Sequence, residues 1–268
     1  MKTKFPIALT MTLLFTVVAS ACFAQTRIPL PAHSTDDYER PRPLFSALQL
    51  RYASVEADVY LVNGELLVGK DVNDLKLGRS LGNLYLEPLR LIVTRNNGQV
   101  YPETTSPLLL IVNIKTAAEA TYQQLERALG PYERFLTRFT SNSTELGAVT
   151  VILGGNRPRD LMENQAERFS AFDGSLADLT SGSVNPNFMP LISDDWNSVF
   201  QWRGAGEMPP EERQSLITFA QLAHDNNVKL RFWASPDIPP VWAELNNAGV
   251  DLISANRIQE LSKFLGEL

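Results

Sequence analysis

The stretch Ser54–Asp71, with the sequence SVEADVYLVNGELLVGKD, contains the side chains of this 268-residue chain whose spacing most clearly suggests chemistry. Two carboxylates, Glu56 and Asp58, stand at alternate positions of an apolar run. In a β-strand such residues point to the same face and lie roughly 6–7 Å apart. Two charges in an apolar setting cost several kcal/mol unless a cation, a proton or hydrogen bonds compensate them. The pair therefore predicts a functional site.

The dipeptide Asn63-Gly64 is a strong hairpin signal, because it lies between two apolar runs. The predicted hairpin brings the chain back to Lys70, close to the two carboxylates. Two carboxylates with a third oxygen ligand would suit a hard cation, Mg²⁺ or Ca²⁺. The ammonium group of Lys70 could instead pair with the carboxylates where such an ion would lie.

His33 ends the first predicted strand, which begins near residue 27. If the first two strands are neighbours, His33 faces Glu56 and Asp58. A neutral imidazole beside carboxylates can act as a general base or a nucleophile in phosphoryl chemistry, and a structural role is the alternative. The other histidine of the chain, His224, lies near the end of a predicted helix and is predicted to be a surface residue. This argues against a two-histidine metal site.

Strands alternate with helices along nearly the whole chain. Strands are predicted to start near residues 27, 54, 107, 149, 168, 188, 229 and 250. This pattern predicts an α/β fold, a single (β/α)₈ TIM barrel. Polar and aromatic residues fall near the carboxyl ends of these strands, where such barrels place their sites, among them Asn113, Asp173, Asp194 and Trp233. A further helix is expected to run to about Arg138, and a long surface loop is expected over 175–187.

Residues 1–24 are expected to be a secretory signal peptide, with a basic start, an apolar run and small residues before Gln25. An alternative cut before Cys22 would leave a lipid-tethered protein. The expected product, residues 25–268, is one domain that is secreted or periplasmic, has no transmembrane segment and contains no cysteine for a disulfide or metal site. The net charge of −6, or −8 once Lys2 and Lys4 are removed, argues against a nucleic-acid partner.

Six segments together resemble the phospholipase C-like phosphodiesterase superfamily, and within it the branch related to the altered-inheritance-of-mitochondria protein. Glycerophosphodiester phosphodiesterases are more distant relatives. The resemblance covers nearly all of the predicted domain, in order. Its segments are HSTDDYERPRP from His33, VEADVYLVNGELLVGKD from Val55, LIVNIK from Leu110, MPLISDDW from Met189, LRFWASPD from Leu230 and GVDLI from Gly249.

The resemblance implies a barrel with a divalent ion near the end of the second strand. It also implies two histidines that act on a phosphodiester, one as general base or nucleophile and one as general acid. Glu56 and Asp58 match the metal-ligand pair, and His33 matches the first histidine of the family motif. Lys115 matches a lysine near the phosphate, and Trp233 is a further expected contact to the substrate.

This chain departs from the family pattern at positions where catalytic residues and a metal ligand are expected. Thr35 and Lys70 stand where histidines are expected, and Asn113 stands where an acidic third metal ligand is expected. The neutral Asn113 weakens any Mg²⁺ or Ca²⁺ site. A lysine with an ordinary pKa of about 10.4 is a poor general acid near pH 7.

Two functions stay open at this point. One is an exported phosphoric diester hydrolase for a glycerophosphodiester or phospholipid-type substrate, with Glu56, Asp58 and Asn113 as ligands and His33 and Lys70 in catalysis. The other is a non-catalytic barrel in which Lys70 replaces the ion. Its pocket would bind a small phosphorylated ligand, such as a phospholipid headgroup, or a protein partner.

Overall fold

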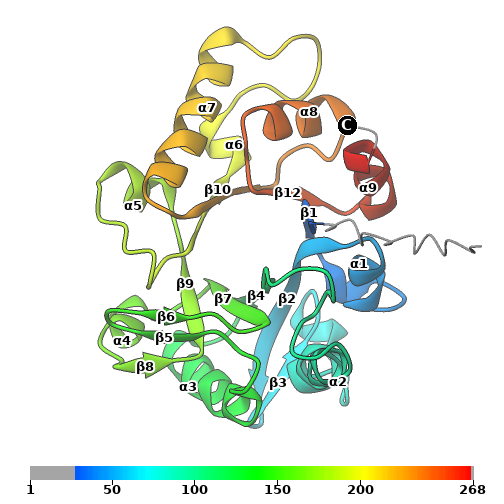
Figure 1. Ribbon diagram of the computed structural model, residues 1–268, viewed down its shortest axis with the longest axis vertical. Helices are drawn as coiled ribbons and strands as arrows, with labels where there is room; N and C mark the ends of the chain where they lie inside the picture. The colour runs from blue at the N-terminus through cyan, green and yellow to red at the C-terminus, as the bar shows by residue number, and fades with distance from the viewer. Residues whose placement is uncertain (1–27, 267–268) are drawn as a thin grey trace, which may run out of the picture.

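The computed structural model describes residues 28–266. The predicted signal peptide and Cys22 lie outside these residues, so their processing stays a prediction. One sheet of nine strands has the order β1-β12-β11-β10-β9-β7-β4-β2-β3, and an additional pairing between β1 and β2 closes it into a ring. All neighbours in the ring are parallel, whereas β3 is an antiparallel addition to β2. The chain therefore forms the predicted (β/α)₈ barrel (Figure 1).

The strands of the ring start close to the predicted positions. They are β1 (Leu30–Ser34), β2 (Tyr52–Val62), β4 (Leu108–Ile114), β7 (Val149–Gly155), β9 (Ser170–Gly174), β10 (Leu191–Asp195), β11 (Lys229–Trp233) and β12 (Leu252–Ala255). Apolar runs such as that of β4 are buried on both faces, as is typical of strands in a parallel sheet covered by helices.

The hairpin predicted at Asn63-Gly64 is confirmed. β2 continues into β3 (Glu65–Val68), with Val62 paired with Glu65 and Val59 paired with Val68. Asn63 and Gly64 have φ angles of 50° and 85°. Positive φ at both central residues is what a two-residue turn of type I′ requires, and asparagine and glycine adopt it at the lowest cost.

Helices pack around the outside of the ring, as Figure 1 shows for α2, α3 and α7. The α-helices are α1 (Phe45–Gln49), α2 (Glu87–Arg95), α3 (Ala118–Leu129), α4 (Arg159–Glu163), α5 (Leu176–Thr180), α6 (Trp196–Val199), α7 (Pro210–Asp225), α8 (Pro239–Asn247) and α9 (Ile258–Gly266). One large apolar core includes residues of the strands and of these helices. A second, smaller core includes Leu109, Ile152, Leu191 and Leu252, which lie near the starts of their strands.

Buried polar residues occur further along the same strands, including Glu56 and Asp58 on β2 and Arg231 on β11. Several strands of the ring, β2 and β11 among them, therefore change from apolar to polar toward the carboxyl end of the barrel. Because all strands of the ring run in parallel, these polar positions meet at one end of the barrel. This is where the alternation of strands and helices predicted the site.

Two local predictions were wrong. The helix predicted to run from Pro131 to about Arg138 is absent from the structure. A single 3₁₀ turn, η4 (Gly130–Tyr132), is followed by β5 (Arg138–Thr140), which pairs with β6 (Thr144–Glu145) and β8 (Glu167–Arg168) in a separate small sheet. Its sequence, Arg-Phe-Thr, is rich in residues that favour strands. The predicted loop over 175–187 contains α5, because Ser175 and Asp178 form a capping box that starts a helix.

Within residues 28–266, no helix is both long and apolar enough to cross a membrane.

Candidate functional site at the carboxyl end of the barrel

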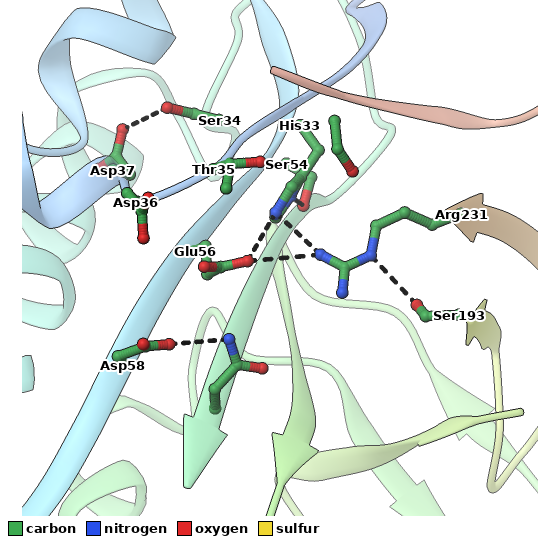
Figure 2. A network of polar contacts seen from close by, with 12 residues as sticks. His33, Ser34, Thr35, Asp36, Asp37, Ser54, Glu56, Asp58, Ser193 and Arg231 are labelled. Carbon is green, nitrogen blue, oxygen red and sulfur yellow. Dashed lines mark hydrogen bonds and ion pairs between the residues drawn. The ribbon is translucent and has the colours of Figure 1, made fainter. Parts of the chain in front are cut away.

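His33 lies fully buried at the end of β1 and contacts three polar groups. Its Nδ1 lies 2.8 Å from Ser54 Oγ, and its Nε2 lies 2.9 Å from Arg231 Nη1 and 3.1 Å from Glu56 Oε2. A guanidinium group has no acceptor, so Arg231 donates to Nε2 and the Nδ1–H of His33 donates to Ser54. Burial, assisted by the charge of Arg231, lowers the pKa of His33 to about 4. The imidazole is therefore neutral at pH 7. Figure 2 shows how His33, Arg231 and Glu56 lie together.

Glu56 extends from the middle of β2 toward His33 and Arg231. Its Oε2 lies 3.5 Å from Arg231 Nη1, and its carboxylate also accepts a hydrogen bond from the backbone amide of Asp36. Against the effect of burial, the charge of Arg231 and this amide hold the pKa of Glu56 low. Glu56 is therefore a carboxylate that Arg231 and the backbone stabilise.

Arg231, on β11, connects strands that are far apart in the sequence, and its side chain is 4 % exposed. Its Nε donates to Ser193 Oγ at 3.1 Å, and its Nη2 lies 3.8 Å from Asp173 Oδ2. The sequence did not lead us to predict Arg231 as a site residue. The signal was available, because a charge between Leu230 and Phe232 in an apolar strand is the same anomaly that identified Glu56.

Asp58 is held by three donors from different elements. Asn113 Nδ2 donates to its Oδ1 at 2.8 Å, while Lys115 Nζ and the Tyr38 hydroxyl lie 2.9 Å and 3.1 Å from its Oδ2. Burial raises the pKa of Asp58, and the hydrogen bonds from Lys115 and Asn113 oppose that rise. The structure thus brings the predicted residues Asp58, Asn113 and Lys115 together and adds Tyr38, which the sequence did not reveal.

Lys70 does not reach the two carboxylates, so the predicted replacement of a metal ion by Lys70 is wrong. Its Nζ lies 3.3 Å from Glu39 Oε2 and 3.6 Å from Asp36 Oδ2, and its side chain is 56 % exposed. The charge of Asp36 raises the pKa of Lys70 above its usual value. Lys70 therefore holds its proton more tightly than an ordinary lysine, which opposes a role as general acid near pH 7. Instead, Lys115 and Arg231 are the cations beside Asp58 and Glu56.

Two further residues lie at the same end of the barrel. Asp173 ends β9 in a fully enclosed position, and its Oδ1 has no hydrogen-bond partner among the described residues. Burial raises the pKa of Asp173, against the opposing charge of Arg231. Trp233 ends β11 two residues after Arg231, and 45 % of its surface is exposed. It therefore presents an aromatic surface to anything that enters from the carboxyl end.

Gly154 makes room for the side chain of Asn113, its register partner on the neighbouring strand. A Cβ atom at position 154 would overlap the Oδ1 of Asn113. We expect Gly154→Ala to displace Asn113 from Asp58 and to lower the free energy of unfolding by about 1–3 kcal/mol, as overpacking does in other cores. Urea unfolding monitored by circular dichroism measures this loss.

Gly130→Ala is the matched control for that substitution, because a Cβ there meets no atom within 4 Å. It should leave stability unchanged or slightly raised. When Asn113 is also replaced by alanine, Gly154→Ala should lower the free energy of unfolding by less, because the amide that it would overlap is no longer present. Equal costs in both backgrounds would show that Gly154 does not act through Asn113.

The surroundings of Glu56 and Asp58 do not fit a divalent ion. Mg²⁺ and Ca²⁺ require several oxygen ligands, whereas nitrogen donors from Arg231, Lys115 and Asn113 contact these carboxylates. Within residues 28–266, no group of three or more histidine, cysteine, aspartate or glutamate side chains is arranged to hold a metal. The protein's own cations already compensate both carboxylates.

Comparisons with known proteins show which family the chain resembles. A family model described as an AIM6-like phosphodiesterase domain matches residues 22–173, more than half of the chain. The altered inheritance of mitochondria protein 6 homolog of Arthroderma benhamiae is 27 % identical over 263 residues, which cover 86 % of this chain and 82 % of that protein. The altered inheritance of mitochondria protein 6 of Eremothecium gossypii is 29 % identical over 271 residues, which cover 87 % and 68 %.

Among solved structures, a glycerophosphodiester phosphodiesterase from Agrobacterium tumefaciens aligns with 88 % of this chain and 98 % of its own. The TM-score is 0.48 and the sequence identity is 12 %.

The fold and the site define the class of protein as a closed parallel barrel whose second strand carries paired carboxylates toward the carboxyl end of the ring. Within that class, the chain belongs to the AIM6-like phosphodiesterase domain family. The resemblance found in the sequence is thereby confirmed at the level of the family.

Proposed function

We propose that this barrel is a non-catalytic member of its family that binds a small phosphorylated ligand at the carboxyl end without a metal ion. The observation that carries the proposal is the pairing of each site carboxylate with a cation from another strand. Lys115 Nζ is 2.9 Å from Asp58, and Arg231 Nη1 is 3.5 Å from Glu56. A divalent ion would have to displace these cations, which would then lie close to it in a mostly buried setting.

The position of His33 also supports a binding role. The side chain is fully buried, and Arg231 already occupies its Nε2. A general base needs an accessible nitrogen within hydrogen-bond reach of the proton that it removes. His33 has that nitrogen turned toward the protein interior, where it accepts a hydrogen bond from Arg231. The residues at 35 and 70, where the family pattern has histidines, supply no replacement base in this chain.

A basic groove beside the site offers a place for the phosphate. It has a volume of about 370 Å³ and is lined by four basic and two acidic side chains: Arg40, Lys70, Lys76, Arg79, Glu39 and Asp74. Tyr38 also lines it, and its hydroxyl contacts Asp58, so the groove borders the charged cluster. Arginine and lysine are the usual phosphate-binding side chains. A local excess of positive charge in a chain of net charge −6 points to an anionic ligand.

We expect calorimetric titration to detect saturable binding of glycerol 3-phosphate, used as the probe, and of inorganic phosphate more weakly. Lys76→Glu reverses a charge in the groove and should weaken binding of glycerol 3-phosphate at least tenfold, or about 1.4 kcal/mol. Lys229→Glu is the matched control, because Lys229 lies at the start of β11, at the other end of the barrel. Equal effects of the two substitutions would contradict binding in the groove.

The same preparation tests the alternative function, a metal-dependent phosphoric diester hydrolase. Here Mg²⁺, Ca²⁺ and Mn²⁺ are each titrated into the protein, and hydrolysis of bis(p-nitrophenyl) phosphate is followed alongside. We expect neither saturable metal binding nor turnover. Saturable metal binding with turnover that Glu56→Gln abolishes would overturn the proposal in favour of the hydrolase.

A further inference from the structure

A cavity of about 660 Å³ lies at the end of the barrel opposite the candidate site. Residues near the strand starts form its inner wall, among them Ala53 of β2, Leu109 of β4, Ile152 of β7 and Leu252 of β12. TIM barrels normally fill their interior with side chains. Here the lower apolar layer is packed as the smaller core, and its outer side also forms part of the wall of an accessible space. The size of this space is within the range of small-molecule sites.

The outer wall of this cavity is also apolar. Phe139 of the small sheet and Leu146 just after β6 contribute from one side, and Ile28 contributes from the start of the described chain. Ile28 and Leu146 are 75 % and 72 % exposed. Each Å² of apolar surface removed from water is worth about 25 cal/mol, so these two side chains would gain most from an apolar ligand in the cavity.

One edge of the cavity is charged. Lys229 and Asp251 line it there, with Lys229 Nζ 3.4 Å from Asp251 Oδ1. Asp251 Oδ2 is already engaged, because it accepts from the backbone amide of Leu230 at 2.9 Å and lies 3.0 Å from His224 Nε2. The side chain of Lys229 is 51 % exposed, and an ammonium group has three donors. Lys229 can therefore bind a second anion at the cavity edge while it keeps its contact with Asp251.

We propose that this cavity binds a single-chain amphiphile with an anionic head, such as a fatty acid. The apolar tail lies against the walls formed by Ala53, Leu109 and Phe139, and the anionic head pairs with Lys229. A purely apolar ligand would leave the exposed ammonium unused, and a purely polar anion would leave the apolar walls in contact with water. Only a ligand with both parts matches the cavity and its edge.

Titration of the protein with dodecanoate, dodecanol and dodecyltrimethylammonium tests this site, with tryptophan fluorescence and calorimetry as readouts. We expect saturable binding of one dodecanoate per chain, weaker binding of dodecanol and the weakest binding of the cation. Lys229→Glu should weaken dodecanoate binding at least tenfold and change dodecanol binding less than threefold. Lys76→Glu, the same charge reversal in the groove at the other end, should leave dodecanoate binding unchanged.

Two substitutions of the walls complete the test. Ala53→Phe fills the cavity and should abolish binding of both dodecanoate and dodecanol. Leu146→Asp changes an exposed residue, which keeps the fold intact, and should weaken binding of both. Absence of saturable binding, or dodecanoate binding that survives Ala53→Phe and Leu146→Asp, would overturn the proposal. So would a dependence on Lys76 in place of Lys229, or adsorption to phosphatidylglycerol vesicles by a protein that does not bind free dodecanoate.

Discussion

Replacement of Arg231 by methionine is expected to lower the free energy of unfolding by about 3–5 kcal/mol, the usual cost of removing one partner from a buried ion pair. The side chain of Arg231 is 4 % exposed and lies within 4 Å of both Glu56 and Asp173. Methionine is of similar length but provides no charge, so Glu56 would remain ionised and buried without its cation. Urea unfolding at pH 7 measures the loss.

Arg138→Met is the matched control, because the side chain of Arg138 is 40 % exposed and pairs with Glu145 and Glu167 at the surface. Exposed pairs of this kind contribute about 0–1 kcal/mol. If the two substitutions lower the free energy of unfolding by the same amount, the network around Arg231 does not stabilise the barrel. The protein would then not need Arg231 to balance its site carboxylates, and the main support for a metal-free site would fail.

The pH dependence of stability should reveal the buried, neutral state of His33. The pKa of His33 is about 4 in the folded protein against 6.5 for an ordinary histidine. Above pH 6.5 the imidazole is neutral in both states, and folding carries no proton penalty. As the pH falls from 6.5 to 4, only the unfolded chain gains the proton, so stability falls by about 3 kcal/mol in total from this residue.

The His33→Gln variant isolates this effect. A glutamine side chain cannot titrate, so the difference in unfolding free energy between wild type and variant should shrink by about 3 kcal/mol between pH 6.5 and pH 4. Buried aspartates with raised pKa values, such as Asp58 and Asp173, change stability in the opposite direction, but they are present in both proteins. A constant difference across this range would place His33 in contact with solvent.

The elements of the barrel could be predicted from local patterns because each depends on near neighbours in the chain. The buried strand β4 follows from a continuous apolar run, and the turn at Asn63-Gly64 follows from the φ angles that these residues tolerate. The helix predicted to run to about Arg138 is absent because the chain there leads into β5, whose structure depends on pairing with β6 and β8. Such pairing is not visible in a local stretch of sequence.

The candidate site could be predicted only in part. Glu56 and Asp58 stand out because a carboxylate in an apolar strand is costly, whatever its partner is. The partner itself was predicted wrongly as Lys70. Pairing of β2 with β3 ends at Val59 and Val68, and the Gly69 amide bonds to the Asp58 carbonyl. Lys70 therefore follows the last paired residues, with its ammonium group directed to Asp36 and Glu39.

Local sequence thus determines which positions carry charge and at which end of the barrel they lie, because strand period and alternation are properties of short segments. The tertiary structure decides which cation balances each carboxylate. Arg231 is 175 residues from Glu56 in the chain, and they meet only because the pairing of β1 with β2 closes the ring. Electrostatic energy depends on distance in space, and for this pair that distance follows from barrel closure.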